Sequence, residues 1–260
     1  MFTWLFGRKA APVVVGATGG SGTRALHAVL SAGGVHMGAN LNHAGDAMDF
    51  EPFLDAHVNA VLRRTRSLDY VPAQLPAGER AAMLAELAGA IAAYRAGVPA
   101  GARWGWKNPR SMYVLPLIHA ICPGLRFVHV LRDGRDMALS DNQNQRNKHF
   151  AALFGREAEA ADAAESIRLW QRANRDVARW GERVLGERYV RVRLEDLCAD
   201  PAGEVAALFD RLGLDRRLAG AAAGHLAAPA SLGRWRDLPA DALAGLQAAG
   251  GEGLARFGYA

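Results

Sequence analysis

The sequence predicts an α/β fold in which helices flank a doubly wound parallel sheet. Two observations carry this prediction: short apolar runs of β-branched residues recur along the chain, and segments with helical periodicity follow them. A continuous apolar run is typical of a strand that is buried on both faces, as the strands of parallel sheets are. Because ligands of such sheets bind at the carboxyl ends of the strands, we expect the functional site there.

The first predicted strand is Pro12-Val-Val-Val-Gly16, and the segment from about 22 to 32 follows it with apolar residues at helical spacing. A second unit begins with a strand at 125–131 and continues into a helix. A third strand is expected at 188–193, and residues 104–106 favour a short fourth strand. Ala-rich segments predict four further helices, at 79–95, 157–185, 202–212 and 240–256.

The composition is typical of a globular protein. The chain has 260 residues, of which 50% are hydrophobic and 22% are charged, and these values exclude a disordered or fibrous protein. No stretch rich in Pro, Gly or Ser divides the sequence. We therefore expect an N-terminal tail at 1–11, followed by a single domain at 12–260.

Charge and cysteine content exclude several kinds of partner and site. The net charge of +5 suits an anionic ligand, but the basic residues are too dispersed to predict nucleic-acid binding. Two cysteines are too few for a disulfide framework and lack metal-ligand spacing, so no zinc site is expected. No run approaches the ~20 apolar residues of a membrane span. We expect a cytoplasmic protein, and the sequence leaves its oligomeric state open.

A glycine-rich segment, Gly16-Ala-Thr-Gly-Gly-Ser-Gly-Thr-Arg24, lies between the first strand and its helix. Glycines at such a turn let backbone N–H groups point toward an anion, which the helix dipole also favours. A nucleoside-triphosphate P-loop carries a lysine before its final Ser or Thr, and no lysine precedes Thr23. The alternative is a turn that serves only strand-to-helix packing. The residues expected to bind the anion are Gly19, Gly20, Ser21, Gly22, Thr23 and Arg24.

A second candidate segment is Arg132-Asp-Gly-Arg-Asp-Met-Ala-Leu-Ser140. Arg132 ends a strand and Ser140 lies on the next helix, one turn after Asp136, so both side chains can face one anion. Together with the glycine-rich segment, this stretch resembles sulfotransferases that use 3′-phosphoadenosine 5′-phosphosulfate (PAPS), the bacterial members in particular. Three further segments are similar to that family in the same order, at 106–110, 193–201 and 232–259.

The resemblance implies a P-loop-like three-layer fold and an enzyme that moves a sulfuryl group from PAPS to a hydroxyl of a carbohydrate or small metabolite. The product is 3′-phosphoadenosine 5′-phosphate (PAP), and no metal is required. Arg132 and Ser140 are expected to clamp the 3′-phosphate, with Arg234 as a further contact. Arg24 is expected to grip the phosphosulfate, and Lys107 of a Lys-x-Pro motif is expected to stabilise the leaving group.

The chain departs from the family pattern at two positions. Many relatives carry a lysine where this chain has Gly20, so we expect Arg24 or Lys107 to take over the role of that lysine. The tyrosine of the strand-end motif is replaced by Leu194, so any contact of this residue with the adenosine is expected to be apolar.

The base that accepts the proton of the acceptor hydroxyl is expected in the segment 37–46. Asp46 is preferred, because this stretch resembles a Leu-Asn-x3-Asp segment of bacterial relatives. His43 is the alternative, because an imidazole titrates close to neutral pH. The non-catalytic interpretation is that Asp46 only caps the helix that carries Phe50 and Phe53.

Several other residues have ordinary structural interpretations. The polar stretch 141–149 predicts a solvated helix face or loop in preference to a mobile cover over the site. Trp170 and Trp180 lie in a helical segment and are predicted to be core residues and not sugar-stacking platforms. His129 and His225 are predicted to be structural.

Two other functions remain as alternatives. A P-loop kinase-like phosphotransferase requires Mg²⁺ and a loop lysine, and only Thr23 supports it. A non-catalytic nucleotide-binding protein would keep Arg132 and Ser140 and bind the donor without turnover.

Overall fold

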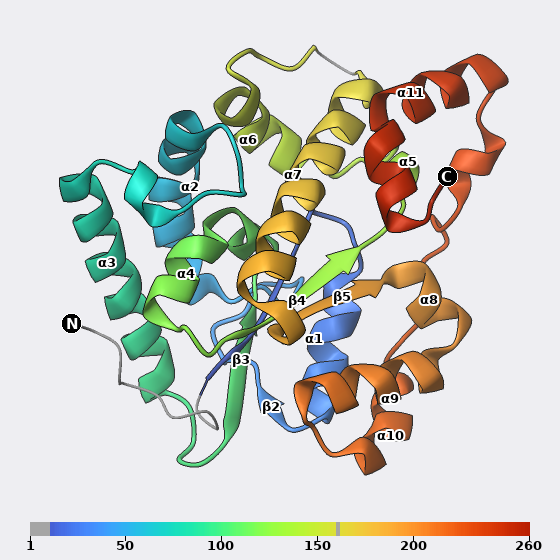
Figure 1. Ribbon diagram of the computed structural model, residues 1–260. Helices are drawn as coiled ribbons and strands as arrows, with labels where there is room; N and C mark the ends of the chain where they lie inside the picture. The colour runs from blue at the N-terminus through green and yellow to red at the C-terminus, as the bar shows by residue number, and fades with distance from the viewer. Residues whose placement is uncertain (1–10, 160–161) are drawn as a thin grey trace.

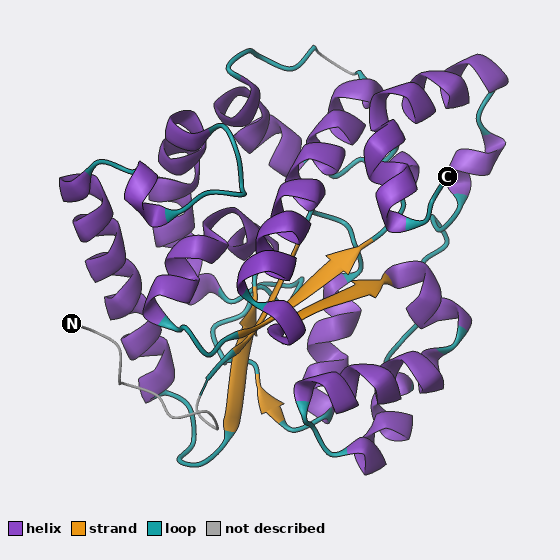
Figure 2. Cartoon of the chain, in the orientation of Figure 1, coloured by secondary structure: helices purple, strands orange, loops and turns teal. Residues whose placement is uncertain are grey.

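A five-stranded, all-parallel sheet forms the centre of the molecule (Figures 1 and 2). The computed structural model describes residues 11–159 and 162–260, so the tail expected at 1–11 lies outside the described residues except for its last one. The strand order is β2-β3-β1-β4-β5, which places β1 in the middle of the sheet. The strands are β1 (Val13–Ala17), β2 (Val35–His36), β3 (Arg103–Lys107), β4 (Arg126–Leu131) and β5 (Tyr189–Arg193).

The predicted α/β fold is confirmed, and the four predicted strands correspond to β1, β3, β4 and β5. The sequence analysis missed β2, because this strand contains only Val35 and His36 and is too short to show a periodicity. The four Ala-rich helices are also confirmed, although the one expected at 157–185 begins only at Ala163. Asp162 precedes this start as an N-cap and accepts a hydrogen bond from the backbone of Ala164.

Helices cover both faces of the sheet, because alternate residues of each strand point to opposite sides. In β1, Val13 and Val15 pack into one core, and Val14 packs into the other. The first core lies under α1 (Thr23–Ala32), α8 (Leu194–Ala199), α9 (Pro201–Leu212) and α10 (Ala219–Ala223). The second is larger and lies under α2 (Glu51–Thr65), α3 (Ala77–Ala96), α4 (Leu115–Ile121), α5 (Gly134–Ala138), α6 (Asn144–Phe154), α7 (Ala163–Val184) and α11 (Ala240–Phe257).

Short 3-10 helices join several of these elements. They are η2 (Met48–Phe50), η3 (Pro72–Gln74), η4 (Pro109–Val114), η5 (Gly186–Arg188), η6 (Arg216–Leu218) and η7 (Arg234–Asp237). In Figure 1, α7 crosses in front of the strands and packs beside α11, which brings the C-terminal segment back to the sheet. This return matters for the site, because η7 then lies close to α5.

His129 is a buried structural residue of β4, as predicted. Its Nε2 lies 2.9 Å from Oδ1 of Asn174, an oxygen that only accepts, and its Nδ1 lies 2.7 Å from the hydroxyl of Tyr189. The neutral ring therefore donates from Nε2 and accepts at Nδ1. Burial lowers the pKa of His129 to about 4, and the nearby Arg191 lowers it further, whereas the hydrogen bond with Asn174 opposes the shift.

Stability should therefore fall as the pH is lowered from 7 to 5. In this window the unfolded chain, with an ordinary histidine pKa, binds a proton that folded His129 does not bind, so acid favours unfolding. We expect His129→Gln to reduce the difference in unfolding free energy between pH 7 and pH 5 by about 2 kcal/mol relative to the wild type. Urea unfolding of both proteins at each pH measures this difference, and an unchanged difference would contradict a neutral buried His129.

Candidate functional site

The glycine-rich loop leads from β1 into the N-terminus of α1. Gly20 and Gly22 have φ angles of +87° and +83°, a left-handed conformation that favours glycine. A Cβ atom at Gly22 would also lie 2.6 Å from a methyl group of Leu194 at the start of α8. The backbone therefore turns sharply and approaches α8 closely, which explains the glycines and gives Leu194 its place beside the loop.

The polar side chains of the loop do not all face the same way. Ser21 is fully buried, and its hydroxyl donates a 2.7 Å hydrogen bond to the carbonyl of Thr18. The hydroxyl of Ser21, which was expected to bind the anion, thus shapes the loop from inside. Arg24 is exposed at the first turn of α1, and no acidic partner is found for it among the residues that the structure describes.

An open pocket of about 700 Å³ lies against this loop. Its lining includes Asp46, Pro109, Leu194, His225 and Pro229. The loop contributes Gly19, Gly20, Gly22, Thr23 and Arg24, and Arg132 joins them from the end of β4. The pocket thus lies at the carboxyl ends of the strands, where the sequence analysis expected it. His225 is exposed here, so its predicted structural role is not what the structure shows.

Lys107 and Asp46 form an ion pair at the end of β3. The ammonium of Lys107 donates to Oδ1 of Asp46 at 2.5 Å and to the carbonyl of Ala44 at 2.6 Å. Lys107 is fully buried, whereas 20% of the Asp46 side chain is exposed in the pocket. Burial lowers the pKa of Lys107, Asp46 opposes this shift, and the positive charge of Arg24 adds to it. The two groups expected to act in catalysis therefore touch each other.

Asn42 holds Asp46 from the other side, and the sequence analysis did not assign it a role. Its Nδ2 donates to Oδ2 of Asp46 at 3.0 Å. Its Oδ1 accepts from the backbone N–H groups of Ala44 and Asp46, both at 2.9 Å. This closed turn fixes both carboxylate oxygens of Asp46. The Leu-Asn-x3-Asp spacing noted above was the signal that pointed to Asn42.

His27 of α1 lies beneath the same turn and was also missed. A Cβ atom at Gly45 would lie 3.3 Å from its ring, and its Nε2 is buried with no partner among the described residues. Burial lowers the pKa of His27, the nearby Lys107 lowers it further, and Asp46 opposes the shift. His43, by contrast, is exposed and does not line the pocket, so the structure brings Asp46 and not His43 to Lys107.

Arg132 directly follows β4 and contacts the glycine-rich loop at Gly20. It is 6% exposed and donates to the carbonyl of Gly20 at 3.4 Å, to Asp136 at 3.1 Å and to the carbonyl of Ser231 at 2.5 Å. A Cβ atom at Gly20 would lie 3.8 Å from the hydroxyl of Ser140, so Arg132 and Ser140 both border the loop at this glycine. The structure thus brings together the two residues expected to clamp one anion.

Arg234, in the segment before α11, does not line this pocket but contacts α5. Arg234 donates to the backbone carbonyl of Asp136 at 2.9 Å. The Nε atoms of Arg132 and Arg234 are both buried and have no hydrogen-bond partner within residues 11–159 and 162–260. Buried guanidinium donors without partners are costly, and an anion with several acceptor oxygens would satisfy them.

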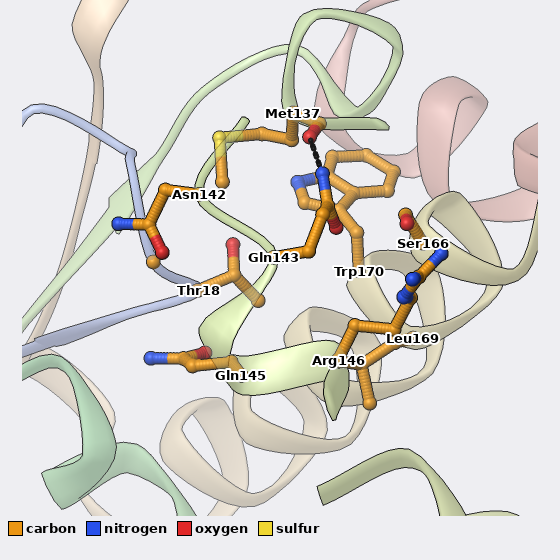
Figure 3. Close-up of a pocket in the computed structure, with 10 residues that line it drawn as sticks. Thr18, Met137, Asn142, Gln143, Gln145, Arg146, Ser166, Leu169 and Trp170 are labelled. Carbon is orange, nitrogen blue, oxygen red and sulfur yellow. Dashed lines mark hydrogen bonds between the residues drawn. The ribbon is translucent and has the colours of Figure 1, made fainter. Parts of the chain in front are cut away.

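The polar stretch 141–149 lies against the glycine-rich loop and is not only a solvated face. Figure 3 shows a small second pocket that is lined by Thr18, Gln143 and Gln145, among other residues. Gln145 donates to the carbonyl of Ala17 at 3.2 Å and accepts from the hydroxyl of Tyr113 at 3.2 Å. The N-terminal part of α6 is therefore anchored to β1, although Asn144 and Asn147 are exposed.

Four of the described tryptophans are core residues. Trp104, Trp106, Trp170 and Trp180 are at most 3% exposed, which confirms the predicted core positions of Trp170 and Trp180. No group of three or more His, Cys, Asp or Glu residues that could hold a metal ion occurs in the described ranges. None of the described helices is both long enough and apolar enough to cross a membrane.

Comparisons with known proteins give the family and the fold of this chain. Residues 12–217 match the Sulfotransferase family. No curated protein matches the sequence significantly. Among solved structures, the chain is similar to the sulfotransferase domain of the olefin synthase from Synechococcus PCC 7002, with 18% identity, a TM-score of 0.58 and coverage of 96% of this chain and 94% of that domain.

Two further structures share the fold. The sulfotransferase domain from the curacin biosynthetic pathway has 14% identity and a TM-score of 0.59, covering 96% of this chain and 98% of that domain. Retinol dehydratase, solved with androsterone and the inactive cofactor PAP, has 17% identity and a TM-score of 0.50, covering 97% of this chain and 82% of the other. At these identities the structures support the fold, whereas the sequence match over residues 12–217 identifies the chain as a member of the sulfotransferase family.

Proposed function

We propose that this sulfotransferase moves a sulfuryl group from PAPS to a hydroxyl of a small metabolite or carbohydrate. The oxygen of the acceptor attacks the sulfur atom, the bond from sulfur to the 5′-phosphate oxygen breaks, and the hydroxyl proton passes to a base. PAP leaves with the negative charge that this bond releases. The observation that carries the proposal is the pair of buried Nε–H donors of Arg132 and Arg234, which have no partner in the described part of the chain and lie beside a glycine-rich loop.

PAPS is expected to lie along the glycine-rich loop, with its 5′-phosphosulfate at α1 and its 3′-phosphate at Arg132. Its 5′-phosphosulfate would meet the N-terminus of α1 and Arg24, where backbone N–H groups and the helix dipole favour an anion. Its 3′-phosphate would meet Arg132, Ser140 and Arg234, and its adenosine would contact Leu194. The PAP bound in the structurally similar retinol dehydratase is consistent with such a donor.

Lys107 and Asp46 are the proposed catalytic pair. Lys107 would supply positive charge where the leaving 5′-phosphate gathers negative charge, and Asp46 would accept the proton of the acceptor. Because their side chains are paired at 2.5 Å, a donor that draws the ammonium toward its own oxygen would free the carboxylate for proton transfer. No step of this mechanism requires a metal ion.

We expect the acceptor to be a small metabolite and not a polysaccharide. Sugar chains are commonly held by exposed aromatic rings, and the tryptophans that flank Lys107 are buried in the core. Asp46 is also held deep in a turn, with one oxygen bound by Lys107 and the other by Asn42. A compact hydroxyl compound reaches such a base more easily than a chain does.

Calorimetric titration with PAP, ATP and ATP with Mg²⁺ tests the donor. Binding of PAP in EDTA, with weaker binding of ATP, supports the proposal, whereas tight binding of ATP only with Mg²⁺ supports a kinase-like phosphotransferase. Turnover of PAPS with a library of hydroxyl compounds distinguishes an enzyme from a nucleotide-binding protein without activity. EDTA is expected to leave this turnover intact.

Arg132→Ala tests the 3′-phosphate site. We expect PAP binding to weaken by about 1.5–3 kcal/mol, the scale of a charge-assisted hydrogen bond, and 5′-AMP binding to stay nearly unchanged. Calorimetry with both nucleotides measures the two changes. Equal losses for PAP and 5′-AMP would mean that Arg132 supports the fold or holds the 5′-phosphate.

A further inference from the structure

We infer that Asp136 is a positioning residue that sets both sides of the 3′-phosphate site at once. It lies in α5 and is 1% exposed. Its Oδ2 accepts from Arg132 at 3.1 Å and from the backbone N–H of Gly233 at 2.7 Å. Its Oδ1 accepts from the backbone N–H of Trp235 at 3.2 Å, and its carbonyl accepts from Arg234 at 2.9 Å.

These contacts join two segments that are about a hundred residues apart in the sequence. Arg132 directly follows β4, whereas Gly233 and the first two residues of η7, Arg234 and Trp235, form a turn near the C-terminus. A buried carboxylate is stable only when its oxygens are fully paired, so Asp136 holds the two segments in one arrangement. The turn lies beyond residue 217, where the sequence match to the family ends.

The charge that remains supports a role in anion binding. Arg132 pairs with the carboxylate of Asp136, whereas Arg234 contacts only its backbone carbonyl, so one carboxylate faces two guanidinium groups and the cluster keeps a net positive charge. Asp136 orients each arginine and leaves its Nε–H unpartnered among the described residues. Asp136 thus fixes the direction of the two Nε–H donors without accepting a hydrogen bond from either of them. A phosphate monoester is an anion that can accept hydrogen bonds from both.

A second anchor keeps the turn against α5. The guanidinium carbon of Arg135 lies 3.6 Å from the ring centroid of Trp235, and Arg135 is itself paired with Asp133 at 2.7 Å. Gly233 has a φ of +79°, which other residues adopt only with strain. Changing Gly233 therefore disturbs the turn without removing any charged group.

This inference rests on the proposed donor, and the experiment separates the two. We expect Asp136→Asn to weaken PAP binding by about tenfold or more and 5′-AMP binding by less than about twofold, because only the 3′-phosphate uses the oriented arginines. Asp176→Asn is the matched control. Asp176 is fully buried and accepts from Arg172 and Arg179, but it lies on α7 away from the turn, so its loss is expected to lower stability and leave the PAP preference unchanged.

Trypsin gives a readout of the turn itself, because it cleaves after Arg234 and Arg236. We expect PAP to protect these bonds in the wild type, and cleavage in Asp136→Asn to be several times faster at a temperature where both proteins are folded. Gly233→Val is the second variant, and it decides the matter if Asp136→Asn does not fold. It is expected to lose PAP preference and protection in the same way.

The outcomes are distinct. A wild type that shows no preference for PAP over 5′-AMP would overturn the proposed donor. A wild type with that preference, together with Asp136→Asn and Gly233→Val variants that retain it and resist trypsin, would overturn the role of Asp136 and leave the proposed donor in place.

Discussion

Replacing Lys107 by alanine is expected to lower kcat by about 10²–10³, the range for removing one preorganised group that stabilises developing charge. The affinity for PAP should change little, because in the resting site the charge of Lys107 is engaged by Asp46. The effect is large here because Gly20 stands where many relatives have a loop lysine, so this chain lacks that second ammonium. Steady-state turnover of PAPS and calorimetry with PAP measure the two quantities.

The dependence of kcat on pH shows whether Lys107 acts through its positive charge or only through packing. Because burial lowers its pKa, the ammonium loses its proton at a lower pH than an ordinary lysine, and kcat should fall as the pH rises through that value. Lys107→Arg should recover part of kcat and move this fall to higher pH, because a guanidinium stays protonated. A variant with unchanged kcat, or a profile that arginine does not move, would contradict the proposed role.

Lys148→Ala is a suitable control, because Lys148 is exposed and pairs with Asp55 on α2. Removing this ammonium changes the net charge by the same amount as Lys107→Ala. Its kcat is expected to stay close to that of the wild type, because such exposed ion pairs contribute little.

The parts of the fold that depend on local patterns were predictable. A continuous apolar run marked β1, short stretches rich in Val or aromatic residues marked β3, β4 and β5, and the carboxyl ends of these strands marked the pocket. Short β2 carries no periodicity, and α6 begins inside a polar stretch whose anchors are Gln143 and Gln145. Such anchors form hydrogen bonds to carbonyl groups, and sequence spacing does not reveal which carbonyl is near.

In the site, too, local patterns could be predicted from the sequence, whereas contacts between distant segments could not. The sequence indicated Lys107 and Asp46 separately, but their contact joins residues 61 positions apart and depends on the packing of a turn against β3. Ser21 could not be predicted to face inward, because its hydroxyl direction follows from the loop conformation. No sequence pattern marked His27 as a site residue, because its ring on α1 joins the site only through the packing of the turn at Gly45 against it.

The largest effect is expected for Asp46→Asn. This change keeps the size of the side chain and its hydrogen bond acceptor for Lys107 but removes the basic carboxylate, so kcat is expected to fall by about 10²–10⁴. The fall of kcat at high pH that is due to Lys107 should remain in this variant. Measuring kcat from acidic to alkaline pH in both proteins gives this comparison.

The affinity for PAP is not expected to fall with kcat in Asp46→Asn. In the wild type, part of the Lys107 charge is engaged by Asp46, so removing the carboxylate charge should leave PAP affinity unchanged or increase it. A residue needed only for folding would weaken both turnover and PAP binding. Asp49→Asn, an exposed carboxylate in the same segment, is the matched control and is expected to retain full activity. If Asp46→Asn is fully active while His43→Ala is inactive, the base is His43, and if both variants are active, the base lies outside the turn that Asn42 and Lys107 hold in place.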